Sequence, residues 1–163
     1  AHVPWVNTGP QTEAAVQAIK YHPRGIRGLG GVRATGYGQT MSYGDYIRKA
    51  NAETMSIIHI ETAEAVDNIE DILAVPDVDV VYLGPTDLSH SLGLAGQGNH
   101  PEVQAHLDRV VEATLKTDVA LGMIVKDAES AQRWRERGAR YIVITLEAVL
   151  GPACRQFVSN ARS

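Results

Sequence analysis

The stretch VDVVYLGPTD, residues 78–87, decides the fold class, because an apolar run ends there in a turn that carries a carboxylate. The run is apolar almost throughout, which is typical of a parallel strand covered on both faces. Gly84 and Pro85 break it, and Asp87 follows two residues after Pro85. Functional side chains in α/β proteins gather beyond the carboxyl ends of parallel strands. Asp87 therefore stands where a site is expected.

Apolar runs of this kind alternate with helix-periodic segments along the chain. We expect strands over residues 2–6, 56–61, 78–83, 119–125 and 141–146. We expect helices over residues 11–21, from 42 to about 51, over 63–75 and 101–116, from 127 to 138, and from about 148 onward. The glycine-rich segments 24–38 and 84–100 are predicted to be loops. Five strand–helix units fit either an open doubly wound sheet or part of a (β/α)8 barrel, and both belong to the α/β class.

Length and charge narrow the class of protein further. The chain has 163 residues, so we expect a single domain over residues 1–163. A formal net charge of −4 leaves no basic stripe for binding nucleic acid. No apolar run approaches the roughly 20 residues of a membrane-spanning helix. The single cysteine, Cys154, cannot form an internal disulfide and fits a cytoplasmic protein.

Two consecutive predicted strands end in carboxylates, Glu61 after the second and Asp87 after the third. If these strands are neighbours, both side chains lie at one end of the sheet, where two anions repel unless a cation or a proton separates them. The interpretations that remain open are a hard cation such as Mg²⁺ or Mn²⁺, a general acid/base pair of glycosidase type, and two separate solvated side chains. Gly84 would let a ligand approach the backbone, and the amides of Thr86, Asp87 and Leu88 would then face a small anion.

Several motifs occur in a fixed order and together resemble one family. They are YHPRGIRG at 21–28, IHIET at 58–62, AVDNI at 65–69, VVYLGPTDLS at 80–89, SLG at 91–93 and HPEV at 100–103. This text closely resembles the HpcH/HpaI family of metal-dependent, class II pyruvate aldolases, over nearly the whole chain. The spacing of 26 residues between Glu61 and Asp87 (87 minus 61) matches the two metal carboxylates of that family.

The resemblance implies a (β/α)8 barrel of the phosphoenolpyruvate/pyruvate type, of which this chain has about the last five strand–helix units. It implies that Glu61 and Asp87 hold Mg²⁺ or Mn²⁺, or else Co²⁺. The amides of Thr86 and Asp87 would bind the substrate carboxylate. The implied reaction cleaves or forms 4-hydroxy-2-oxo acids, giving pyruvate and an aldehyde through a metal-stabilised enolate. A related decarboxylase or CoA-ester lyase remains an alternative, and we expect a homo-oligomer.

The sequence departs from the family pattern in three respects. The last strand ends in VITLE at 143–147 instead of the usual apolar-Gly-Val-Asp, which leaves the aldehyde specificity open. The family commonly has Gln two positions before the metal Glu, whereas this sequence has His59, which is interpreted as a substrate contact, a neutral core histidine or an extra metal ligand. The general-base His and the Arg of the family have no counterpart, and residue 1 falls within a strand pattern. We therefore expect that three strand–helix units precede this chain and either belong to the native protein or associate with it. The alternative is a truncated, inactive remnant that binds metal and pyruvate.

Overall fold

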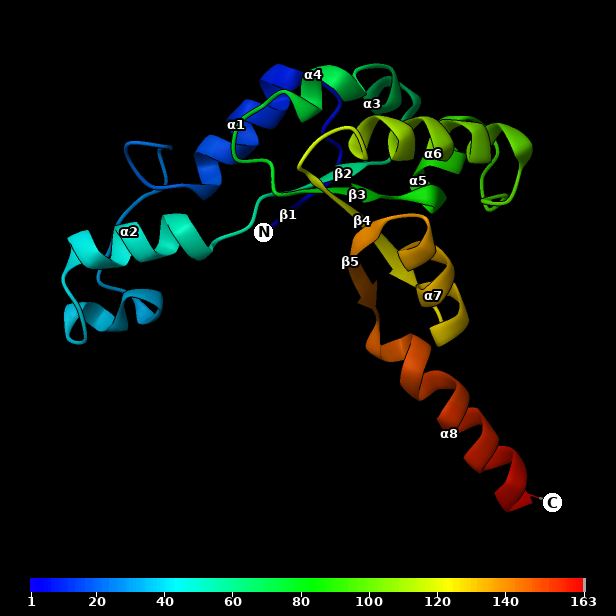
Figure 1. The fold of residues 1–163 in the computed structure, drawn as a ribbon. Coiled ribbons are helices and arrows are strands. Elements are labelled where there is room, and N and C mark those ends of the chain that lie inside the picture. Colours follow the sequence, from blue (N-terminus) through cyan, green and yellow to red (C-terminus); the bar gives the residue numbers. More distant parts are fainter. Residues whose placement is uncertain (163) are drawn as a thin grey trace.

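Five parallel strands form one sheet in the computed structural model, which describes residues 1–162 (Figure 1). Ser163, the last residue of the predicted domain, lies outside the described residues. The strands are β1 (His2–Val3), β2 (Ile57–Ile60), β3 (Val80–Leu83), β4 (Ala120–Val125) and β5 (Ala139–Ile144), and each pairs with the next in chain order. All five predicted strands are present, although β1 ends at Val3 instead of residue 6, and β5 begins and ends two residues before its predicted range.

The helices connect successive strands, as the alternating pattern predicts. They are α1 (Gly9–Ile19), α2 (Tyr43–Glu53), α3 (Ala63–Asp67), α4 (Ile69–Leu73), α5 (Pro85–Ser91), α6 (Pro101–Thr114), α7 (Ala128–Glu136) and α8 (Leu146–Arg162), with a 3-10 helix at Arg33–Gly38. Thr8, Ser42 and Asp127 accept the expected capping hydrogen bonds at the starts of α1, α2 and α7. None of the helices within residues 1–162 is long and apolar enough to cross a membrane.

Three details of the predicted helices and loops are wrong. The segment 84–100 begins with α5, because Gly84 and Pro85 start a helix instead of opening a loop. The predicted helix 63–75 is two short helices that meet at Asn68, whose φ of −100° and ψ of 18° depart from helical values. The predicted loop 24–38 contains the 3-10 turn, where Gly36 and Tyr37 have positive φ angles.

The main core lies between the sheet and the helices on one of its faces. Strand residues alternate in direction, so Ile58, Ile60, Val81 and Leu83 join this core together with residues of α3, α4 and α6. The opposite face is concave and has a smaller cluster of Ile57, Val80 and Tyr82. Helices on one face and strands in sequential order are features of a barrel segment and not of a doubly wound sheet.

The curvature of the sheet brings its first and last strands together across the concave face. His2 on β1 contacts Tyr141 on β5, with an Nε2–Oη distance of 3.0 Å, although three strands separate them in the sheet. Side chains of a flat sheet would be too far apart for this contact, because adjacent strands lie nearly 5 Å apart. The protein therefore has the α/β fold expected of part of a (β/α)8 barrel.

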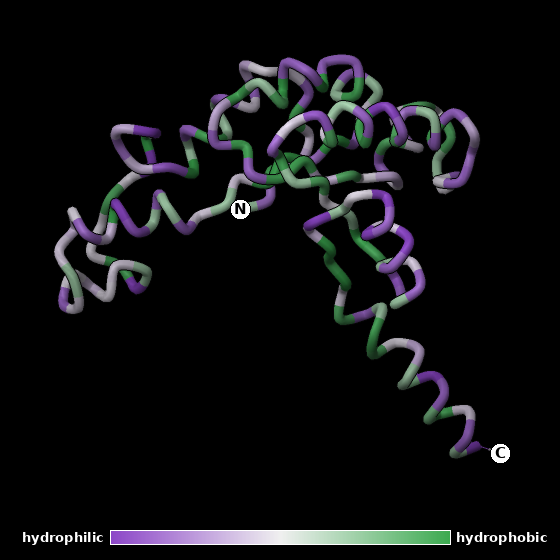
Figure 2. The backbone as a smooth tube through the Cα atoms, in the orientation of Figure 1, coloured by the Kyte–Doolittle hydropathy of each residue, from purple (hydrophilic) through white to green (hydrophobic). Residues whose placement is uncertain are grey.

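Two segments lie away from this core. Figure 1 shows α8 extending from the end of β5, and none of its described side chains is buried. Figure 2 shows that the adjoining strand β5 is strongly hydrophobic, and its Ile142 and Ile144 are exposed. At the other end of the sheet, α2 is joined to α1 by Asn51, whose side chain donates to and accepts from the backbone of Tyr21.

Candidate functional site

The two predicted carboxylates follow neighbouring parallel strands. The register pairs Ile60 of β2 with Leu83 of β3, so Glu61 and Gly84 are the next residues on each strand. The amide of Gly84 donates to the carbonyl of Ile60 at 3.1 Å, which extends the pairing by one step. The prediction that these strands are adjacent and end at the same edge is therefore confirmed.

Glu61 is a buried carboxylate, with only 4% of its surface exposed. Its Oε1 accepts a hydrogen bond of 2.8 Å from the amide of Trp5, and its Oε2 lies 3.5 Å from Nδ1 of His59. Trp5 presents this amide from a left-handed backbone conformation, with φ of 56°. A non-glycine residue in that region costs of order 1 kcal/mol or more, which the surrounding contacts must offset. Contacts with Trp5 and His59 thus fix the positions of both carboxylate oxygens of Glu61.

Gly84 packs directly against this carboxylate. A Cβ atom at position 84 would lie 2.7 Å from Cβ of Glu61 and 2.9 Å from its Oε2. These distances are shorter than any van der Waals contact, so only glycine fits without moving Glu61. The sequence interpretation gave Gly84 the role of admitting a ligand to the backbone, and the contact with Glu61 supplies a second reason for glycine here.

The first turn of α5 contains the other predicted residues. Gly84 is the N-cap, Pro85 begins the helix, and Asp87 is its third residue, one turn from the glycine that touches Glu61. Among the described residues, no hydrogen-bond acceptor contacts the amides of Thr86 and Asp87. The amide of Leu88 donates to Gly84 at 2.9 Å, so the expectation that it faces an anion is wrong. The Asp87 side chain is exposed and makes no hydrogen bond or ion pair within residues 1–162.

His59 lies on the concave face, among aromatic residues of other strands. Its Nε2 is 2.8 Å from Nδ1 of His2, and its ring centroid is 4.7 Å from that of Tyr82. Sequence reasoning missed His2 and Tyr141 as neighbours of the site. The alternation of side chains along a strand predicts which face of the sheet each residue occupies. Only the curvature of the sheet shows that β1 and β5 meet. Burial, followed by the nearby His59, lowers the pKa of His2 below its usual value.

The donor set is small but suits a hard cation. Within residues 1–162, no group of three or more His, Cys, Asp or Glu side chains is arranged to hold a metal ion. Mg²⁺ is commonly bound by only one or two carboxylates, with waters and substrate in its other positions. Glu61 is buried and Asp87 is unpaired, and the two follow adjacent strands, which fits this mode of binding. Thiol or imidazole ligands would instead favour a softer metal ion.

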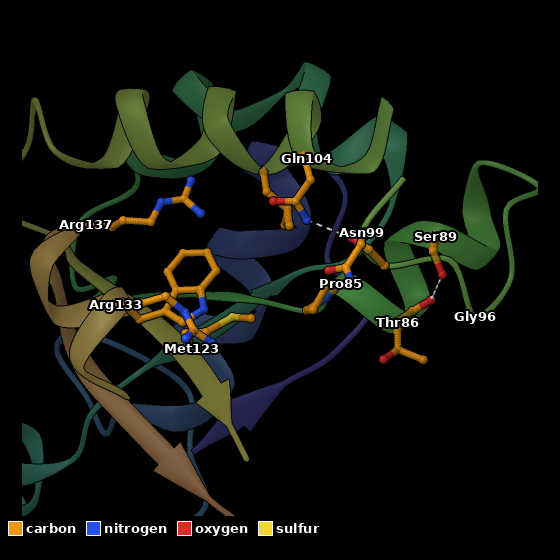
Figure 3. A pocket seen from close by; sticks show the side chains of 12 residues that line it. Pro85, Thr86, Ser89, Gly96, Asn99, Gln104, Met123, Arg133 and Arg137 are labelled. Atoms are coloured by element: carbon orange, nitrogen blue, oxygen red, sulfur yellow. Dashed lines mark hydrogen bonds between the residues drawn. The ribbon is translucent and has the colours of Figure 1, made fainter. Parts of the chain in front are cut away.

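A cavity of about 360 Å³ lies on the helix side of the sheet, between α5, α6 and α7 (Figure 3). Pro85 and Thr86 form one wall, whereas Glu61 and Asp87 do not line it. Its two arginines already have carboxylate partners, since Arg133 pairs with Glu129 and Arg137 with Asp108. The cavity is therefore separate from the predicted carboxylate site.

Residues 1–150 match the model of the family described as HpcH/HpaI aldolase/citrate lyase. The chain belongs to this family. The match confirms the resemblance seen in the sequence motifs. It also covers all five strands and the helices through α7, so the whole sheet is part of the family fold.

Relatives within the HpcH/HpaI family agree with this assignment. The chain is 36% identical over 150 residues to a 4-hydroxy-2-oxo-heptane-1,7-dioate aldolase of Escherichia coli, covering 91% of this chain and 56% of that protein. It is 38% identical over 150 residues to a hydroxypyruvate/pyruvate aldolase of Delftia acidovorans, covering 91% of this chain and 55% of that protein. The chain thus spans little more than half the length of these relatives.

A solved structure shows the same fold. A family protein from Burkholderia cenocepacia superimposes with a TM-score of 0.89 at 36% identity, covering 99% of this chain and 64% of that one. The agreement extends over every strand described above. The predicted fold class, part of an HpcH/HpaI-type barrel, is therefore confirmed.

Proposed function

We propose that this chain forms the metal- and pyruvate-binding part of a metal-dependent aldolase, a carbon–carbon lyase that cleaves or forms 4-hydroxy-2-oxo acids. The observation that supports this most directly is the buried carboxylate of Glu61, whose two oxygens contact Trp5 and His59, beside the turn that bears Asp87. Membership of the HpcH/HpaI family and the aldolase names of its relatives support the same reaction class. The products on the cleavage side are pyruvate, or a related 2-oxo acid, and an aldehyde.

In this proposal Glu61 and Asp87 hold a divalent cation, Mg²⁺ or Mn²⁺. A cation there supplies Lewis-acid stabilisation of the enolate of the 2-oxo acid. The amides of Thr86 and Asp87 bind the substrate carboxylate, since both lack an acceptor and lie in the first turn of α5. His59 lines the substrate side of the site and faces Glu61. No residue of this chain is assigned as general base.

The general base and the arginine of the family pattern are assigned to the part of the relatives that this chain does not span. That assignment leaves a second candidate function, a remnant that binds metal and a 2-oxo acid without catalysis. The partial coverage of the relatives, 56% of the Escherichia coli protein, is the observation that favours considering it. We also propose a cytoplasmic protein that acts as a homo-oligomer or joined to the remaining strand–helix units.

Metal binding tests the carboxylate assignment. Titration calorimetry with Mn²⁺ should show that Glu61→Gln and Asp87→Asn each abolish measurable binding, because each substitution removes an anionic ligand. Glu64→Gln is the matched control, since Glu64 is an exposed carboxylate three residues along the chain from Glu61. Unchanged Mn²⁺ affinity in either site variant would contradict the proposal.

Deuterium exchange separates the aldolase from the remnant. An aldolase should exchange the methyl protons of pyruvate in D₂O when Mn²⁺ is present, because exchange requires enolate formation. The protein isolated from its own cells is the sample, and its intact mass shows whether it is longer than this 17.6 kDa chain. Mn²⁺ binding without exchange, from a protein of this mass, would support the remnant and reject the aldolase.

A further inference from the structure

Trp5 lies two residues beyond the end of β1, next to the buried carboxylate of Glu61. Its amide donates a hydrogen bond of 2.8 Å to Oε1 of Glu61, although 56 residues separate the two along the chain. A tryptophan side chain reaches only a few ångströms from its own backbone, so the indole lies near this carboxylate as well. Trp5 is nevertheless 54% exposed. A large aromatic surface therefore stands open beside the site.

Contacts that follow Trp5 along the chain hold its backbone in the left-handed conformation. Val6 is buried in the main core. The carbonyl of Asn7 accepts from Nδ2 of Asn68 at 2.9 Å, and Oδ1 of Asn7 accepts from the hydroxyl of Thr62 at 2.6 Å. Strained backbone persists only where the surrounding structure over-determines it, and residues of this kind cluster at active sites and ligand-binding sites. These contacts, with the bond to Glu61, meet that condition for Trp5.

The hydrogen bond to Glu61 does not require a tryptophan. Glycine adopts positive φ readily and would donate the same amide without strain. The indole belongs to neither buried cluster of the sheet, and within residues 1–162 it makes no hydrogen bond and no ring contact. It therefore adds nothing to the core that would offset the strain of its backbone. The ring is available to a bound molecule, against which an aromatic side chain can bury roughly 150–250 Å².

The order of the strands places Glu61 between Trp5 and the turn that bears Asp87. Trp5 follows β1, Glu61 follows β2 and the turn follows β3, and these strands pair in that order. In the function proposed above, the amides of Thr86 and Asp87 bind the carboxylate of the 2-oxo acid. A molecule that is held at that turn and extends past Glu61 reaches the end of β1. Its carbons derived from the aldehyde then lie against Trp5.

We propose that Trp5 is a specificity-determining residue, whose indole packs against the aldehyde-derived part of the 4-hydroxy-2-oxo acid and selects aldehydes with uncharged, apolar chains. Within residues 1–162, no Lys or Arg pairs with Glu61 or stacks on Trp5, so an anionic chain finds no counter-charge there. The carboxylates of Glu61 and Asp87 repel such a chain further. The proposal rests on the function proposed above and names the class of aldehyde that it takes.

Binding of short 2-oxo acids to the full 163-residue chain with Mn²⁺ tests this proposal. Pyruvate ends at C3, 2-oxopentanoate has two further carbons, and 2-oxoglutarate has the same length with a terminal carboxylate. Titration calorimetry should show 2-oxopentanoate binding about 10-fold more tightly than pyruvate, since each buried methylene contributes up to about 4-fold. 2-Oxoglutarate should bind no more tightly than pyruvate. Equal affinities for pyruvate and 2-oxopentanoate, or a preference for 2-oxoglutarate, would overturn the proposal.

Two substitutions at position 5 separate the indole from the amide. Trp5→Gly keeps the amide at a φ that glycine tolerates, and the preference for 2-oxopentanoate over pyruvate should disappear. Trp5→Phe keeps an apolar ring and should retain most of the preference. Because the preference is a ratio of two affinities, a displacement of Glu61 that weakens both ligands equally does not change it. An undiminished preference in Trp5→Gly would overturn the proposal.

Trp134→Phe supplies the control and a second measurement, because Trp134 is the other of the two tryptophans. It lies on α7 at the separate cavity, so the substitution should keep the preference. The tryptophan fluorescence of this variant comes from Trp5 alone. With Mg²⁺, which is not paramagnetic, 2-oxopentanoate should shift the emission to shorter wavelength more than pyruvate does, because the longer chain removes the indole from water. Emission that is insensitive to bound 2-oxopentanoate would contradict the contact.

The same titrations distinguish a failure of this proposal from a failure of the proposed function. If the unsubstituted chain binds neither Mn²⁺ nor pyruvate, the proposed function fails, and the role of Trp5 fails with it. If the chain binds both but does not prefer the longer acid, only the role of Trp5 fails and the metal site stands.

Discussion

At the scale of single residues, the contact between Gly84 and Glu61 gives the sharpest prediction. Gly84→Ala should displace the Glu61 carboxylate and weaken Mn²⁺ binding without changing any charge, because its Cβ would lie 2.9 Å from Oε2 of Glu61. Overpacking of this kind typically costs about 1–3 kcal/mol of stability. Calorimetric titration with Mn²⁺ and urea unfolding measure the two effects.

Gly28→Ala is the control for that substitution. No atom lies within 4 Å of a Cβ at position 28, so this change introduces no clash. It should leave Mn²⁺ affinity unchanged. Equal Mn²⁺ affinity in the Gly84→Ala chain and the Gly28→Ala chain would contradict the role given to Gly84.

At the scale of elements, Thr62 connects the site strand β2 to α3 and to the loop after β1. Its hydroxyl accepts from the amide of Ala65 at 3.0 Å and donates to Oδ1 of Asn7 at 2.6 Å. Thr62→Ala should lower the free energy of unfolding by about 1–2 kcal/mol, because a buried cap and its partner lose their hydrogen bonds. Thr62→Ser keeps the hydroxyl and should lose far less. Equal urea midpoints for Thr62→Ala and Thr62→Ser would refute this explanation.

The capping box at the start of α7 predicts a pH dependence. Hydrogen bonds from the side chain and then the backbone of Ser130 hold the pKa of Asp127 below its usual value. The native state therefore prefers the ionised carboxylate. The cap stabilises the fold fully above the unfolded pKa of about 3.9, and this contribution is lost as the pH falls from there through the lower native value.

Asp127→Asn should remove this part of the acid dependence, because the amide does not titrate. Thermal unfolding followed by circular dichroism between neutral and acidic pH measures it. Asp118→Asn, at an exposed aspartate before β4, is the control and should keep the unsubstituted profile. Parallel pH profiles for the Asp127→Asn and unsubstituted chains would rule out the capping contribution.

At the scale of the whole molecule, the apolar surface of β5 and α8 predicts association. Large apolar side chains are exposed along this surface: Ile142, Ile144, Leu146, Val149, Leu150, Phe157 and Val158. An exposed strand edge beside such a surface is a ready site for pairing with another chain. Sedimentation velocity should therefore show species larger than the 17.6 kDa monomer at raised concentration.

Phe157→Asp should shift that equilibrium toward monomer, because Phe157 is 74% exposed and its replacement with a charge disrupts only an intermolecular contact. Tyr37→Asp changes a similarly exposed ring, 65% accessible, in the segment before α2 and serves as control. A purely monomeric unsubstituted chain at all concentrations would contradict the proposed homo-oligomer.

The sequence by itself determined the features that depend on neighbours along the chain. Apolar runs located all five strands, and the caps Thr8, Ser42 and Asp127 marked helix starts, because a capping side chain bonds an amide only two or three residues away. Glu61 and Asp87 were recognisable for a similar reason, since Glu61 ends one strand pattern and Asp87 lies in the turn after the next. Family motifs added the metal and substrate roles, which stay predictions.

Only the tertiary structure decided which side chains surround Glu61. The amide of Trp5 reaches it from 56 residues away, and Tyr141 contacts His2 across 139 residues. Both contacts depend on the register of parallel strands and on the curvature of the sheet, which no local pattern encodes. Placement of the helices on a single face is likewise a consequence of strand order, and it separates a barrel segment from a doubly wound sheet. Local hydrogen bonds and burial patterns thus predict the elements, whereas the closure of the sheet creates the site.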